Sequence, residues 1–163
     1  MAAGPGCRPG CSPAWCAAPP AGGGGRRARR ALDELRAAVA PYDQANINVM
    51  PLTQADFPLP TLGAKLNEIR AELLYGRGFG LIRGLPVDEF GKRGAAIAFW
   101  AVGQHLGDDV LSQNKHGHVL GHVTDIGESR NNPSQRGPYS REEIPFHVDC
   151  SDIVGLLCME VSR

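Results

Sequence analysis

The sequence has no long apolar run, no excess of one charge and no framework of paired cysteines. Its apolar stretches are interrupted before the roughly 18 to 20 residues that a membrane-spanning helix needs, so we expect a soluble chain with no membrane partner. Lysine plus arginine and aspartate plus glutamate both number 17, and the resulting net charge of zero argues against a nucleic-acid partner. At 163 residues the chain has the length of one domain, and its expected partner is a small molecule.

The cysteines fall into two groups, and neither resembles a disulfide framework. Three lie in a leader rich in glycine and proline, and two lie in an apolar C-terminal stretch: Cys7, Cys11 and Cys16, then Cys150 and Cys158. An odd count without a secretory segment predicts a reducing compartment, the cytoplasm. A zinc site on the leader cysteines would need a fourth ligand, and none lies nearby in the sequence.

The first 30 residues are expected to form a disordered leader. Residues 1–25 contain seven glycines and five prolines, and no acidic residue occurs before Asp33. Such a composition cannot bury enough apolar surface to offset the entropy lost on ordering. The arginine-rich, acid-free start is also typical of a transit peptide, so an organelle stays open as the alternative to the cytoplasm.

Two helices are predicted in the part of the chain that we expect to be folded, residues 46–163, after a short helix or linker over residues 31–45. In that linker a helix over residues 31–39 should end before Pro41, because proline disfavours helical backbone at the preceding residue. The first helix of the folded part is expected to be capped by Thr61 and to stop at Gly76. Its apolar residues recur at helical spacing: Leu62, Leu66, Ile69 and Leu73. The second helix is predicted over residues 88–106, where it buries Ile97, Phe99 and Trp100.

Four segments are predicted to be strands. They are rich in β-branched and aromatic residues and are bounded by turn residues. They cover residues 79–85, 119–125, 144–149 and 153–159, with a polar loop at residues 131–141. The last of them is a continuous apolar run, which favours a strand buried on both faces, although a run this short is also compatible with a buried helix.

A possible metal site lies in the third of these strands. On a strand, side chains at positions i and i+2 project to the same face, so His147 and Asp149 can offer a nitrogen and an oxygen to one ion. A second histidine from elsewhere would complete the two-histidine, one-carboxylate set that leaves sites open on Fe(II). The alternative is that the two side chains pair with each other or with water at the strand end.

Three further histidines cluster before this pair. His116 and His118 also have i, i+2 spacing, and His122 follows shortly after. This cluster could supply a third iron ligand or form a separate zinc site. Clustered histidines on a polar segment are also compatible with a solvated or hydrogen-bonded structural role.

Four blocks of the sequence resemble, in order and spacing, the N-terminal half of the TauD/TfdA-like dioxygenases of the taurine dioxygenase type. These blocks are GFGLIRGLP at residues 78–86, LSQN at 111–114, LGHV at 120–123 and IPFHVDCSDIVGLLC at 144–158. The resemblance covers about residues 46–160. It implies an α+β fold, the N-terminal portion of a double-stranded β-helix (jelly roll) with helices preceding the strands.

The same resemblance implies a reaction and its site. It implies Fe(II) as the metal, 2-oxoglutarate as co-substrate and O2 as oxidant of a small organic substrate, with His147 and Asp149 as the first two iron ligands. It places the stretch of Ser112, Gln113 and Asn114 near the substrate pocket. The distal histidine and the arginine that binds 2-oxoglutarate are expected beyond Arg163, so we expect an incomplete domain that is inactive alone. A non-catalytic fragment or degenerate relative, or a zinc-binding module on the histidine cluster, stays open, as does the oligomeric state.

Overall fold

The computed structural model of the protein describes residues 25–44, 50–108, 110, 119–124, 146–149 and 151–160. It divides into two compact units, one of residues 1–108 with 157–163 and one of residues 109–156. The helices of the described residues all lie in the first unit: α2 (Arg26–Gln44), the 3-10 helix η1 (Gln54–Asp56), α3 (Pro60–Tyr75) and α4 (Val87–Leu106). No helix in these ranges is long and apolar enough to cross a membrane.

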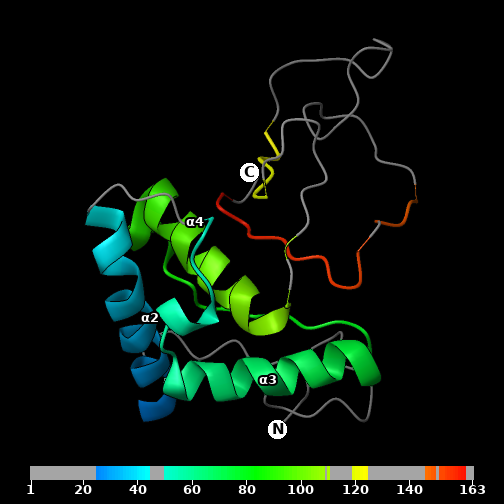
Figure 1. The fold of residues 1–163 in the computed structure, drawn as a ribbon, viewed down its shortest axis with the longest axis horizontal. Coiled ribbons are helices and arrows are strands. Elements are labelled where there is room, and N and C mark those ends of the chain that lie inside the picture. The colour runs from blue at the N-terminus through cyan, green and yellow to red at the C-terminus, as the bar shows by residue number, and fades with distance from the viewer. Residues whose placement is uncertain are drawn as a thin grey trace, which may run out of the picture. The chain divides into compact units, whose positions relative to one another are not determined.

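The three long helices pack against one another, so that each contacts the other two (Figure 1). Each helix contributes one apolar face to a shared core, and the loop between η1 and α3 adds two more side chains. The buried apolar residues are Leu35, Ala38, Val39, Phe57, Leu59, Leu66, Ile69, Ala95, Ile97, Ala98, Trp100 and Ala101. Because fully burying one large apolar side chain stabilises a fold by about 1.5 to 3 kcal/mol, this core is the main source of stability in the helical unit.

Helix α2 is longer than the helix predicted over residues 31–39. It begins at Arg26, so the arginines that we assigned to the leader form its first turns, and it continues through Pro41 to Gln44. Tertiary contacts hold this last turn, although proline removes a backbone donor there. The Tyr42 ring packs edge-on against Phe57 with centroids 5.3 Å apart, and its hydroxyl donates to the carbonyl of Asp56 at 3.3 Å.

Helix α3 confirms the predicted periodicity but begins in a different way. Leu66 and Ile69 are buried, and Gly76 follows the last helical residue as predicted. The N-cap position is Leu59, with Pro60 as the first helical residue, so the expectation that Thr61 caps this helix is wrong. Leu59 has no side-chain oxygen that could accept from the first N–H groups, and a residue of another helix takes over this role.

Helix α4 closely matches the predicted helix over residues 88–106. It contains a local break at Gly91, whose φ of 63° and ψ of −178° lie outside the helical region. Ile97 and Trp100 are buried as predicted, whereas Phe99 is only half-buried. An ion pair joins α4 to α2, because the Arg36 guanidinium binds both carboxylate oxygens of Glu89, at 2.6 and 2.8 Å.

The predicted α+β jelly-roll portion is wrong for the part of the chain that the structure describes, which is helical and contains no strand. Residues 79–85 and 153–159 have neither helix nor strand, and the described parts of 119–125 and 144–149 do not have them either. Apolar side chains in these segments are exposed, among them Phe79 at 64% and Leu156 at 85%. A strand needs a neighbour for its N–H and C=O groups, and apolar composition alone supplies none. The polar loop predicted at 131–141 lies outside the described residues.

Candidate functional site

The predicted metal-binding pair lies on a short stretch of the second unit, residues 146–149. This stretch has neither helix nor strand, and all four of its side chains are exposed. Phe146 and Val148, which flank His147, are 109% and 91% exposed. The prediction that a strand projects His147 and Asp149 to the same face is therefore not supported here, because these residues do not form a strand. Their assignment as metal ligands rests on their residue types and spacing.

The structure does not bring these two side chains together with a third ligand. Within the described residues, no group of three or more His, Cys, Asp or Glu side chains is placed to hold a metal ion. His122 is described and exposed, whereas the other two members of the histidine cluster lie outside the described residues. The same is true of the residues expected near the substrate pocket, Ser112, Gln113 and Asn114.

The thiol of Cys158, a described residue, belongs to no such metal-binding group within the described residues. Cys158 is free and exposed, and its Sγ donates to the carbonyl of Glu160 at 3.3 Å. Cys150 and the three leader cysteines lie outside the described residues. Our expectation that the leader cysteines lack a fourth ligand for a closed zinc site is therefore untested.

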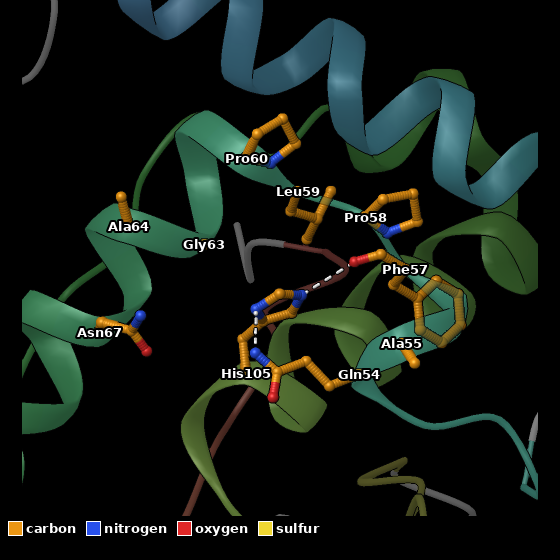
Figure 2. Close-up of a pocket in the computed structure, with 10 residues that line it drawn as sticks. All are labelled: Gln54, Ala55, Phe57, Pro58, Leu59, Pro60, Gly63, Ala64, Asn67 and His105. Atoms are coloured by element: carbon orange, nitrogen blue, oxygen red, sulfur yellow. Dashed lines mark hydrogen bonds between the residues drawn. The ribbon is translucent and has the colours of Figure 1, made fainter.

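A buried polar cluster that sequence reasoning missed lies in the helical unit, around His105 in the last turn of α4. Figure 2 shows its ring between η1 and α3. The His105 Nε2 atom lies 3.0 Å from the carbonyl oxygen of Phe57, which can only accept, so Nε2 carries the proton. The Nδ1 atom then accepts from the side-chain amide of Gln54 at 3.2 Å. Both ring nitrogens of this 7% exposed residue are satisfied as a neutral imidazole.

The cluster borders a groove of about 630 Å³. Its lining is mostly apolar and consists of Gln54, Ala55, Phe57, Pro58, Leu59, Pro60, Gly63, Ala64, Asn67 and His105 (Figure 2). Gly63 lets α3 approach the imidazole closely, since a Cβ there would lie 3.1 Å from His105 Nδ1. Because His105 is bonded within the protein through both nitrogens, its role is to join η1 and the following loop to the end of α4.

The position of His105 could have been read from the sequence. It lies four residues after Ala101, which in turn follows Ala98 and Gly94 at helical spacing, and all of these residues are buried. A histidine on the apolar face of a helix predicts a buried imidazole that needs two hydrogen-bond partners. The identity of those partners, on segments about 50 residues away, has no local signal.

Glu34 of α2 caps the neighbouring helix α3. Its Oε2 accepts from the backbone N–H groups of Thr61 at 2.8 Å and Leu62 at 3.1 Å, and Arg30 Nε lies 3.3 Å from Oε1. Burial raises the pKa of this carboxyl, but the hydrogen bonds from Thr61 and Leu62 and the Arg30 charge outweigh it and lower the pKa below 4.5. The carboxylate therefore supplies the acceptor and the negative charge that a helix N-terminus favours.

Comparison with known proteins gives the family of the chain. Residues 39–163 match the taurine catabolism dioxygenase TauD, TfdA family. The chain belongs to this family. The match confirms the resemblance seen in the four sequence blocks and extends it to the end of α2.

Two curated proteins are similar to the chain. FR-33289 synthase of Streptomyces rubellomurinus is 30% identical over 131 residues, which are 80% of this chain and 38% of that protein. Taurine hydroxylase-like protein SAT17 of Stachybotrys chartarum is 25% identical over 135 residues, 79% of this chain and 35% of that protein. The chain thus spans little more than a third of the length of these relatives. No solved structure matches the chain.

The donor atoms of the predicted pair suit the metal expected in a TauD/TfdA-like protein. An imidazole nitrogen and a carboxylate oxygen are the ligand types of non-haem Fe(II) sites with open positions. His147 and Asp149 offer one of each, two residues apart, and their exposure leaves them accessible to an ion. They fit as two members of a three-ligand set.

Proposed function

We propose that the chain contributes His147 and Asp149 as two Fe(II) ligands to a 2-oxoglutarate-dependent dioxygenase that oxidises a small organic substrate with O2. The observation that carries this proposal is the family match over residues 39–163, which includes this His-x-Asp pair within the most specific of the four sequence blocks. The similarity to taurine hydroxylase-like protein SAT17 favours hydroxylation as the oxidation.

The role of the two side chains is to hold and orient the metal. When bound, Fe(II) together with 2-oxoglutarate supplies the activation of O2 that no side chain can provide. His147 would offer a ring nitrogen and Asp149 a carboxylate oxygen to the metal. We propose that the substrate lies near the stretch of Ser112, Gln113 and Asn114, whose amide and hydroxyl groups can orient a polar small molecule.

The proposal is tested by titrating the protein with Fe(II), or with Co(II) as a spectroscopic substitute, in the absence of O2. We expect His147→Ala and Asp149→Ala each to weaken binding by at least about tenfold, because each removes a ligand in direct contact with the metal. Asp152→Ala is the matched control, since Asp152 is an exposed carboxylate of the same neighbourhood. Its affinity should equal that of the unaltered protein.

A further variant separates this proposal from the zinc-binding alternative. If His122→Ala abolishes both Fe(II) and Zn(II) binding while the His147 and Asp149 variants retain both, the histidine cluster is the metal site and the iron assignment is wrong. Equal Fe(II) affinity in the His147, Asp149 and Asp152 variants would also refute the assignment. Circular dichroism of each variant checks that the helices of the first unit are unchanged.

A further inference from the structure

We draw no further inference here: the strongest candidate, the exposed apolar surface patch at the end of α3 and on the segment that follows it, carries nothing because nothing in the structure shows what covers its residues Tyr75, Phe79, Leu81 and Ile82.

Discussion

Replacing Glu34 should destabilise the helical unit, because its carboxylate caps a neighbouring helix. The side chain is only 13% exposed, and one oxygen accepts from two backbone N–H groups at the start of α3. Glu34→Ala removes this acceptor, and neither Leu59 nor Pro60 can replace it. Loss of a helix cap costs about 0.5 to 2 kcal/mol, and hydrogen bonds to a charged group contribute about 1.5 to 3 kcal/mol.

From these values we expect Glu34→Ala to lower the free energy of unfolding by about 2 kcal/mol. For a chain of this size that corresponds to a Tm lower by roughly 4 to 8 °C. Glu34→Gln should cost about 1 kcal/mol, because its amide oxygen can still accept but no longer carries the charge that favours the helix N-terminus. The measurement is urea unfolding followed by circular dichroism at a wavelength that reports helix.

The pH dependence provides a second readout of the same contact. The pKa of Glu34 is lower in the folded protein than its ordinary value of 4.5. Its stabilising effect is therefore fully present above pH 4.5 and is lost as the pH falls through the lower folded-state pKa. The stability difference between the unaltered protein and Glu34→Gln should shrink in acid.

The matched control is Glu68→Gln on α3, since Glu68 is 62% exposed and pairs with Lys65 on the same helix. Exposed pairs of this kind contribute about 0 to 1 kcal/mol, so its unfolding curve should nearly overlay that of the unaltered protein. If Glu34→Ala were as stable as Glu68→Gln, or if the effect of Glu34→Gln grew below pH 4.5, the cap would not have the role assigned here.

Two further predictions test the core of the helical unit. Gly63→Ala should lower the free energy of unfolding by about 1 kcal/mol, because its Cβ would lie 3.1 Å from the His105 ring. Gly103→Ala should raise it by up to about 1 kcal/mol, because a Cβ there meets nothing within 4 Å and alanine favours the helix. Thermal melts that rank the two variants the other way would contradict the packing of α3 against His105. Leu66→Ala should lower the free energy of unfolding by about 2 to 5 kcal/mol, because Leu66 is 0% exposed. Leu74→Ala should lower it by less than about 1 kcal/mol, because Leu74 is 40% exposed. Equal midpoints of chemical denaturation for the two variants would show that α3 does not pack as described.

The amount of structure that could be predicted differs between helices and strands. The apolar spacing of Leu66 and Ile69 and the glycine at position 76 located α3, and Ile97 and Trp100 located α4. Both predictions rely on local signals, since a helix forms its hydrogen bonds within one segment. The segment at residues 79–85 has strand-like composition but no strand, because pairing depends on a partner that composition does not specify.

The sequence by itself determined the family, through motifs at fixed spacing, and the positions of α3 and α4, through apolar periodicity. It also singled out His147 and Asp149 as the candidate metal ligands, and this assignment stays a prediction. Only the tertiary structure decided how the helical unit is held together, with Glu34 of α2 capping α3 and His105 of α4 joined to Gln54. The physical reason is range: periodicity and motifs act over a few neighbouring residues, whereas caps and buried hydrogen bonds join residues that are far apart in the chain and meet only when it folds.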